Sequence, residues 1–384
     1  MIEYWVWLSL RKRVGARGIS ELLQAFGTPE NIYRADKEQL LHTPGVSQAM
    51  LPSLLDKELA SANRVLEDCY SRQIRILTMF EEDYPPVLRA IGDPPAVLYL
   101  RGSLPETENR AVIGIVGSRK ASAYGLSVAE RMGYALHAGG CTVVSGMARG
   151  VDTAAMRGAL KAGDRVIAVL GCGADVVYPK ENRALYEEIC ARGCVISEYC
   201  PGTPPLAENF PPRNRIISGL SDGVLVVEAS AHSGSLITAE RALEQNRDVF
   251  AVPGNLGLST CEGSNRLLKD GAELVQSAQD ILQVYSDRYP DTVSFPEVQP
   301  TERTSQKTID LSNTINYIDL NENPDHLPEN AVTLLRALGS ASMDMDELTD
   351  ASGLPAGTVR SMTTLLQVKE YLQRSGGNRF SRKR

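Results

Sequence analysis

The chain of 384 residues has few of the residues that build metal, disulfide or hydrolase sites. Its seven cysteines are an odd number without a C-x-x-C pair, and its four histidines are scattered, so the sequence predicts no metal site. Apolar runs follow some of the cysteines, which is typical of buried thiols in a reducing cytoplasm. No G-x-S-x-G turn marks a serine nucleophile, and no two acids have the spacing of a metal-dependent pair. We therefore predict no catalytic residue, no metal and no cofactor.

Long hydrophobic runs are also absent. The apolar start at residues 2–10 is too short to span a bilayer and is followed by Arg11, Lys12 and Arg13. The other apolar runs have the length of strands, so we expect a soluble cytoplasmic protein with no membrane partner. The net charge of -7 argues against a protein that coats DNA indiscriminately, although a local basic groove is compatible with it.

Composition divides the chain into four regions. Residues 1–70 are helical and contain a Pro-Gly turn between two apolar segments, typical of a helix-hairpin-helix element or of a plain helical packing unit. Residues 71–286 alternate strands and helices. Residues 287–329 are rich in Pro, Asp, Asn and Thr and are predicted to be a linker. Residues 330–384 have three helical patterns and a basic strand-like end, the order of a winged-helix domain, which binds duplex DNA or a protein partner.

The second region determines the predicted fold class. Its strand-length runs, from IRILTM to DVFAVPG, are apolar throughout, which suits a parallel sheet covered on both faces. Five helical patterns lie between them: Leu126–Ala138, Asp152–Lys161, Asn182–Arg192, Ser235–Gln245 and Asn265–Asp270. We therefore predict an α/β protein with a Rossmann-like, doubly wound, mostly parallel sheet.

Four loops at predicted strand ends are rich in glycine and serine: GSRK, SGMARGVD, GCGADVVYP and ASAHSGSL. Ligands of a parallel sheet lie beyond the carboxyl ends of its strands, and unpaired N–H groups at helix starts bind anions. Four such loops predict a row of phosphate sites along one sheet edge, which fits a polynucleotide better than one nucleotide. The patterns G-x-G-x-x-G and G-x-x-x-x-G-K-[ST] are missing, which disfavours a dinucleotide and ATP.

The stretch ENFPPRNRIISGL places two arginines just before an apolar segment. Arg213 and Arg215 bind phosphates with their planar guanidinium groups, or they form ion pairs with Asp222 or Glu228. Phe210, just upstream, is either a ring on which a base stacks or a part of the core. The sequence leaves both alternatives open.

A resemblance to a known family adds to these patterns. The stretches GIVGSRKASAYG, VVSGMARGVDTAA, VIAVLGCGADVVYPKEN, FPPRNRIISGLSDGVLVVEA and SGSLITAERALEQNRDVFAVPG are similar to the DNA-processing protein A family (DprA, also called Smf), in the right order over nearly all of residues 71–286. The resemblance implies a homodimer that binds single-stranded DNA without catalysis, protects it and loads the RecA recombinase onto it during natural transformation. It also implies a sterile-alpha-motif-like domain at the N-terminus and a winged helix at the C-terminus.

The same motifs imply a set of DNA contacts. By position these are Gly117, Ser118, Arg119, Lys120, Gly146, Phe210, Arg213, Asn214, Arg215, Ser233, Gly234 and Ser235. One departure concerns Ala207, because some family members have a lysine three residues before the aromatic. We expect that this contact is missing, or that Lys120 or Lys180 supplies it.

A nucleotide-processing enzyme of the phosphoribohydrolase type is the alternative function. Those proteins share the Rossmann shape but carry a PGGxGT signature. Here the comparable strand end has a small-residue loop and an acid, between Ser233 and Glu240. Release of a free base from a nucleoside monophosphate would support this alternative.

Overall fold

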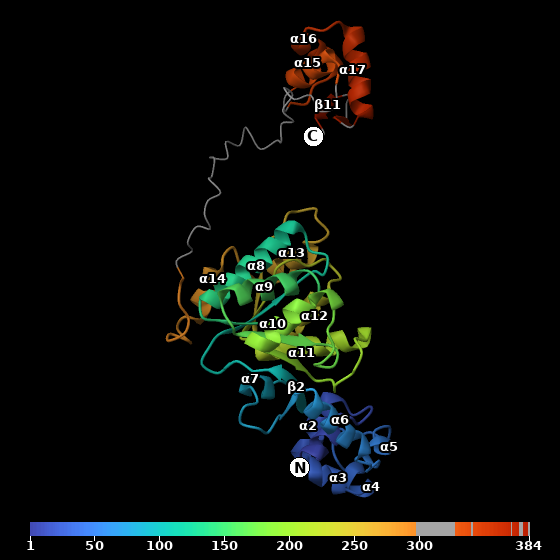
Figure 1. The fold of residues 1–384 in the computed structure, drawn as a ribbon, viewed down its shortest axis with the longest axis vertical. Helices are drawn as coiled ribbons and strands as arrows, with labels where there is room; N and C mark the ends of the chain where they lie inside the picture. The colour runs from blue at the N-terminus through green and yellow to red at the C-terminus, as the bar shows by residue number, and fades with distance from the viewer. Residues whose placement is uncertain (297–326, 339–340, 370, 376–378, 383–384) are drawn as a thin grey trace. The chain divides into compact units, whose positions relative to one another are not determined.

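The structure is a computed structural model that describes residues 1–296, 327–338, 341–369, 371–375 and 379–382. The chain forms two compact units, Met1–Val298 and Gln299–Arg384 (Figure 1). Most of the predicted linker 287–329 lies outside the described residues, as do Lys383 and Arg384 of the predicted basic end.

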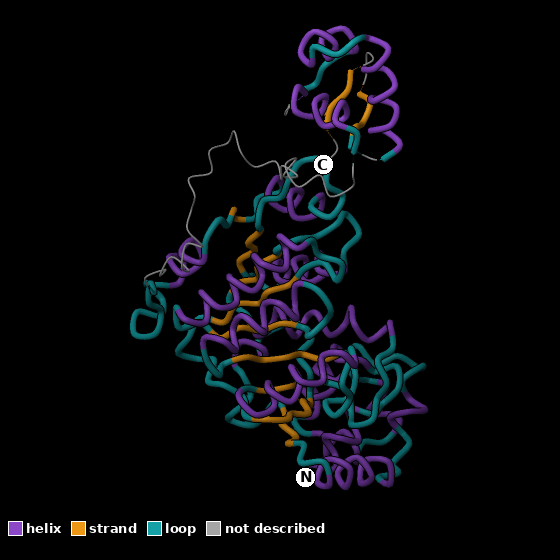
Figure 2. Tube along the Cα trace, turned by 45° about the horizontal axis from the view of Figure 1, so that its top comes forward, coloured by secondary structure: helices purple, strands orange, loops and turns teal. Residues whose placement is uncertain are grey.

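One nine-stranded sheet organises the first unit, with the order β1-β2-β6-β5-β4-β3-β7-β8-β9 (Figure 2). The strands are β1 (Arg75–Thr78), β2 (Val97–Gly102), β3 (Val112–Val116), β4 (Thr142–Ser145), β5 (Val166–Leu170), β6 (Cys194–Ser197), β7 (Gly223–Val226), β8 (Asp248–Ala251) and β9 (Glu273–Leu274). Every neighbouring pair from β6 to β9 is parallel. The predicted α/β class with a mostly parallel sheet is confirmed.

The first two strands differ from the rest, because β2 is antiparallel to both β1 and β6. A parallel crossover usually needs a connecting helix of substantial length. The connection between β1 and β2 contains only the four-residue helix α7 (Pro86–Arg89). The chain therefore returns beside β1 in the opposite direction.

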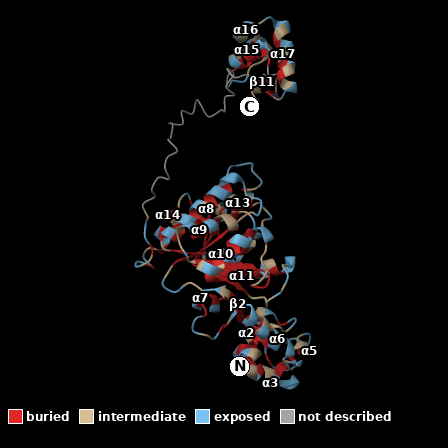
Figure 3. Cartoon of the chain, in the orientation of Figure 1, coloured by how far each residue is buried: buried red, intermediate tan, exposed pale blue. Residues whose placement is uncertain are grey.

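Helices cover both faces of the parallel part of the sheet, and the strands between them are buried (Figure 3). The five predicted helices are α8 (Ala123–Ala138), α9 (Val151–Ala162), α10 (Arg183–Arg192), α12 (Gly234–Glu244) and α13 (Glu262–Lys269), each within three residues of its expected ends. The sequence did not predict α11 (Phe210–Leu220), whose prolines resemble a helix breaker. Proline is tolerated in the first turn of a helix, where its missing N–H has no partner to lose. Helix α14 (Ala278–Tyr285) follows β9.

The order of strands reverses between β3 and β7. From β3 the chain winds through β4 and β5 to β6, and from β7 it winds the other way through β8 to β9. Such a reversal opens a crevice outside the carboxyl ends of the two central strands, where α/β proteins bind their ligands.

Six helices occupy residues 1–71: α1 (Ile2–Ser9), α2 (Gly15–Phe26), α3 (Pro29–Arg34), α4 (Lys37–Leu41), α5 (Leu51–Leu54) and α6 (Ala60–Ser71). Their core is continuous with one face of the sheet, because Trp7 and Leu22 belong to the same buried cluster as Leu98 and Val224. The predicted Pro-Gly turn lies between α4 and α5, and the Glu21 carboxylate lies against Gly45. The division into domains at residues 1–70 and 71–286 stays a prediction, as does the motif assignment.

The second unit contains three helices and a hairpin in its described residues. These are α15 (Glu329–Leu338), α16 (Met345–Ser352), α17 (Ala356–Val368), β10 (Leu372–Ser375) and β11 (Arg379–Arg382), the last two antiparallel. The helices share a core that includes Leu335, Leu348 and Leu366. Across the described ranges of both units, we find no helix that combines the length and the apolar character needed to cross a membrane.

Candidate nucleic-acid interface

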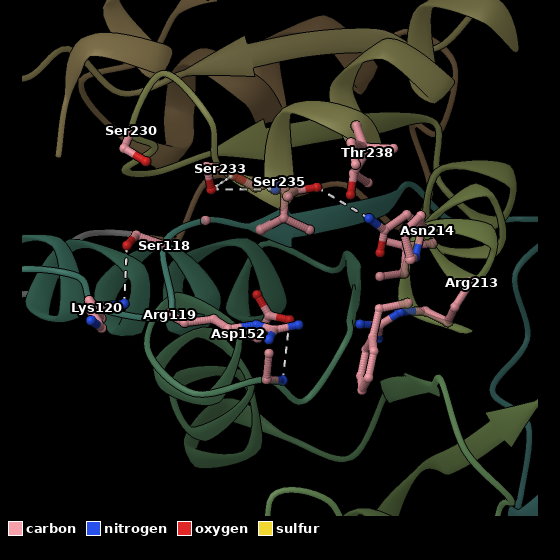
Figure 4. A pocket seen from close by; sticks show the side chains of 18 of the residues that line it. Ser118, Arg119, Lys120, Asp152, Arg213, Asn214, Ser230, Ser233, Ser235 and Thr238 are labelled. Atoms are coloured by element: carbon pink, nitrogen blue, oxygen red, sulfur yellow. Dashed lines mark hydrogen bonds between the residues drawn. The ribbon is translucent and has the colours of Figure 1, made fainter. Parts of the chain in front are cut away.

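A pocket of about 670 Å³ opens at the crevice between β3 and β7. Ten of the twelve predicted contacts line it: Gly117, Ser118, Arg119, Lys120, Phe210, Arg213, Asn214, Ser233, Gly234 and Ser235 (Figure 4). The other two, Gly146 and Arg215, are not among its lining residues. Residues from two strand ends and from α11 therefore meet at one place, although 118 positions separate Gly117 from Ser235 in the chain.

An aromatic ring lies among cations at one side of this pocket. Phe210 begins α11 and is partly exposed. The guanidinium carbons of Arg119 and Arg213 lie 5.2 Å and 5.8 Å from its ring centre, within the range of a cation–π contact. Tyr178 packs against the ring at 5.6 Å between centroids, and Gly171 leaves room for it, since a Cβ there would lie 3.1 Å from Phe210. The ring is therefore held in place with one part open to the pocket.

Arg213 is a buried cation at the edge of the pocket, with 3% of its surface exposed. Its Nη1 donates hydrogen bonds to the carbonyl oxygens of Gly146, at 2.8 Å, and of Val169. Burial lowers its pKa, and the negative charge of Asp152 opposes this effect. Arg213 thus links the ends of β4 and β5 and adds positive charge beneath the ring.

Arg215 has a different environment although it lies only two residues further along α11. Its side chain is buried in ion pairs with Asp93, at 3.2 Å, and Glu198, at 2.7 Å. An ion pair was one of the two alternatives for this residue, but the expected partners Asp222 and Glu228 are wrong. The partners that the structure shows precede Arg215 by 122 and 17 positions in the chain.

At the start of α8 a carboxylate of the chain itself is bound. The Glu228 carboxylate, 2% exposed, accepts hydrogen bonds from the backbone N–H of Ser122 at 3.1 Å and from its hydroxyl at 2.9 Å. A Cβ on Gly125 would lie 2.0 Å from the same carboxylate, so glycine is needed for this approach. The position that favours an anion at this helix N-terminus holds the chain's own acid.

A second carboxylate fills the loop after β4. Asp152, in the first turn of α9, accepts hydrogen bonds from the backbone N–H groups of Gly146 at 3.1 Å and Ala148 at 3.3 Å. Burial raises its pKa to about 6, against the opposing effects of Arg213 and of these two amides. The expectation that all four loops offer bare amides to phosphates is therefore wrong for the loops after β3 and β4.

The start of α12 is arranged differently. Ser233 caps the helix, and its hydroxyl lies 2.8 Å from that of Ser235. Gly234 is exposed with open space where a Cβ would be, and Thr238, one turn further, directs its hydroxyl into the pocket (Figure 4). Among the described residues, no carboxylate is hydrogen-bonded to the amides of this helix start. It is the place in the pocket best suited to a phosphate.

Main-chain hydrogen bonds join the three loops that surround the crevice. The N–H of Ser118 donates to the carbonyl oxygen of Glu228 at 2.6 Å, and the N–H of Val151 donates to the carbonyl oxygen of Ser118 at 3.2 Å. Gly117 permits this contact, because a Cβ there would lie 2.9 Å from the same Glu228 oxygen. The loops after β3, β4 and β7 therefore form one connected frame.

Sequence reasoning missed several lining residues, among them Tyr178, Asp152 and Thr238. Tyr178 lies in the loop after β5, in the stretch VVYPKEN, and its neighbours Pro179 and Lys180 form no pattern that predicts a ring in a binding site. Asp152 was assigned only to the first turn of a helix, which is correct but omits its contact with Gly146. Thr238 lies one turn into α12, a spacing that a helical projection from Gly234 would have found.

The crevice at the reversal of a parallel sheet, with its ring, buried cation and open helix start, defines a Rossmann-like protein built to hold a ligand that is both anionic and aromatic. Residues 75–286 match the family described as DNA recombination-mediator protein A, and the chain belongs to this family.

Several proteins of known sequence or structure are similar to this chain. Protein Smf of a Synechocystis species is 32% identical over 400 residues, covering 99% of this chain and 98% of the relative. The crystal structure of DNA processing protein A from Streptococcus pneumoniae superposes with a TM-score of 0.64 at 34% identity, covering 74% of this chain and 98% of that one. A structure of DNA processing protein A from Helicobacter pylori, whose title concerns its single-stranded DNA binding mode, has a TM-score of 0.51 at 30% identity, covering 56% and 97%.

Proposed function

We propose that this protein binds single-stranded DNA in the pocket between β3 and β7 and does not cleave it. The observation that carries the proposal is Phe210, partly exposed and flanked by the guanidinium groups of Arg119 and Arg213. A base stacked on such a ring gains about 1–3 kcal/mol with little sequence preference. A duplex keeps its bases stacked on one another, so only an unpaired strand offers a base to this ring.

The phosphates have separate partners in this proposal. One phosphate lies at the start of α12, near Gly234 and Ser235, where N–H groups and the helix dipole favour negative charge. Arg119 and Lys120 are both exposed at the tip of the loop after β3 and supply positive charge beside it. The Helicobacter pylori relative, described as binding single-stranded DNA, supports the same role here.

Binding is proposed rather than nucleotide hydrolysis because of where the acids lie. Glu240, which the hydrolase alternative needs, is exposed on α12 and does not line the pocket. Among the described residues, Asp152 is the acid that lines it, and two amides already bind its carboxylate. Incubation with nucleoside monophosphates should release no free base, and release of base would overturn this part of the proposal.

We further propose that the protein protects the strand and loads RecA onto it as a homodimer in natural transformation. Membership of the recombination-mediator family supports this role. The test is the rate at which RecA assembles on an oligonucleotide with and without the protein, with nuclease resistance and solution mass measured alongside. An unchanged assembly rate would contradict the loading role.

The second unit is proposed to be a winged helix that contacts duplex DNA or a protein partner. Its order of three helices and a hairpin supports this. Removal of residues 299–384, the whole second unit, should leave oligonucleotide binding unchanged, because the first unit carries the whole pocket. If the shortened protein lost single-strand binding, that binding would be assigned to the second unit instead.

The central experiment compares single-stranded and duplex DNA of equal length by fluorescence anisotropy. Phe210→Ala and Arg119→Ala should weaken single-strand binding on the order of tenfold each without a change in melting temperature. The matched control is Arg17→Ala, an exposed arginine on α2. Log affinity should fall with log salt at roughly 0.7 per neutralised phosphate. A flat salt response, or equal affinity for duplex, would contradict the proposed function.

A further inference from the structure

We propose that the bound strand continues out of the pocket over the exposed face of α8, where bases stack on Tyr124 and Tyr134 and Arg131 meets the phosphates. This inference rests on the proposed function and extends the binding site beyond the residues assigned to the pocket.

The three residues lie on one side of α8. At about 100° per residue, Tyr124, Ser127, Arg131 and Tyr134 fall within about 80° around the helix axis, and all four are exposed. The opposite side is packed into the protein, with Gly133 so close to α9 that a Cβ would lie 2.0 Å from the carbonyl oxygen of Ala155. The exposed side is thus held on a firm support, about 15 Å long from the first tyrosine to the second.

Among the described residues five phenylalanine or tyrosine rings are exposed, and two of these five lie together on this side of α8. Tyr124 is 62% exposed and Tyr134 is 50% exposed. The core beneath α8 is filled by aliphatic side chains such as Val128 and Leu136, so packing does not require either tyrosine. Flat rings spaced along a cationic surface are the arrangement that binds single strands without reading their sequence.

The positions of the charged residues also favour the exposed side of α8 as a DNA-binding surface. Arg131 forms no ion pair within the described part of the chain, whereas its neighbour Glu130 is neutralised by Lys161 of α9. Lys120, which lines the pocket, lies four residues before Tyr124 and is exposed. A strand leaving the pocket past Lys120 therefore meets positive charge and then the first ring.

The other margins of the pocket are less suitable for a polyanion. The margin at Pro205 and Ala207 continues into Glu208, which is exposed, and the margin at Thr260 continues into Glu262. Next to the lining residue Ala148, Arg149 is paired with Glu181, whereas Lys180, two positions after the lining residue Tyr178, is exposed. We therefore infer a path that runs from Tyr178 across Phe210 to Lys120 and then along α8.

The test uses the full chain and two oligo-dT lengths, one of about six nucleotides that fills the pocket and one of about twenty that reaches α8. Tyr124→Ala combined with Tyr134→Ala should weaken binding of the long strand roughly tenfold and leave the short strand unchanged. Replacement of both tyrosines by phenylalanine should restore long-strand affinity, because a ring without the hydroxyl still stacks. The matched control is Tyr70→Ala, which removes a ring that is 91% exposed on α6.

Each outcome bears on one proposal. Equal loss for both lengths would mean that the pocket itself was disturbed, and no loss for the long strand would mean that α8 does not touch DNA; either result overturns the inference. If the wild-type protein binds neither length, the proposed function fails instead. Arg131→Ala should lower the salt dependence for the long strand only, by roughly 0.7 in the slope, and an unchanged slope would also count against the path.

Discussion

Helices α8 and α12 begin at the same sheet edge, on either side of the reversal between β3 and β7, yet their starts are occupied differently. At α8 the carboxylate of Glu228 is bound by Ser122 and fills the position that attracts an anion. At α12 the start formed by Ser233 and Gly234 opens into the pocket. A strand-turn-helix rich in small residues is therefore not sufficient for phosphate binding, because an internal acid can take the place of the ligand.

The position of that acid explains the difference. Glu228 is the second residue after β7, and its backbone carbonyl also accepts a hydrogen bond from the loop after β3. The side chain of Glu228 thus occupies the start of α8, and its backbone connects the loop after β3 to the end of β7, which leads to α12. Two substitutions test this comparison. One places an acid at the start of α12, and the other neutralises the acid at the start of α8.

The largest effect is expected from closing the start of α12. Gly234→Asp places a carboxylate where a Cβ meets no atom within 4 Å, so the chain should fold normally and an acid in the first turn should even stabilise the helix. Repulsion of the phosphate should weaken single-strand binding by about tenfold to a hundredfold, measured by anisotropy. The control Gly234→Asn adds a side chain of the same size without charge and should keep most of the affinity. Equal loss in both variants would show that size and not charge is responsible.

A smaller effect of opposite sign is expected at α8. Glu228→Gln retains the shape but removes the negative charge, so the potential in the pocket becomes more positive and binding should strengthen a few-fold. The weaker hydrogen bonds to Ser122 should lower the free energy of unfolding by about 1 kcal/mol, measured by urea denaturation. Weaker DNA binding by a folded Gln variant would contradict the assignment of this acid as a stand-in for an anion.

The smallest effect concerns Asp152, the acid at the third helix start. Its pKa is raised to about 6 by burial, so it loses its negative charge as the pH falls from 7.5 to 5, while the DNA phosphates keep theirs. Single-strand affinity should therefore rise about two- to threefold over this range, and Asp152→Asn should abolish the rise. The protein with and without Asp152→Asn also carries His232→Gln, which removes the histidine between the lining residues Ser230 and Ser233. A rise that persists in the Asn variant would assign the pH dependence to another group.

The sequence predicted the sheet well because apolar strands and amphipathic helices are local patterns. The runs AVIGI and RVIAVL became the buried strands β3 and β5, and α8, α9, α10, α12 and α13 lie where periodicity placed them. The helix α11 was missed because its first turn contains two prolines. The antiparallel direction of β2 goes with the absence of a long crossover helix between β1 and β2, which the apolar patterns of the strands do not report.

The sequence predicted most of the residues near the candidate site but not what each of them contacts there. Glycine, serine and arginine at strand ends identified most of the lining residues. Whether Arg213 or Arg215 faces the pocket depends on partners such as Asp93, which is 122 positions away from Arg215 in the chain. The contact between Glu228 and Ser122 spans 106 positions. Ion pairs and caps of this kind are formed by the fold, so residue type and local spacing cannot assign them.

The main-chain frame that joins Ser118, Val151 and Glu228 has a consequence for the choice of ligand. Since these loops are already fixed before the ligand arrives, the loss of conformational freedom on association falls almost wholly on the nucleic acid. Under the proposed function, flexible and unstacked stretches such as oligo-thymidine should form the complex more readily than segments that must first melt a hairpin or a purine stack. The protein would then select its ligand by flexibility, without reading the base sequence.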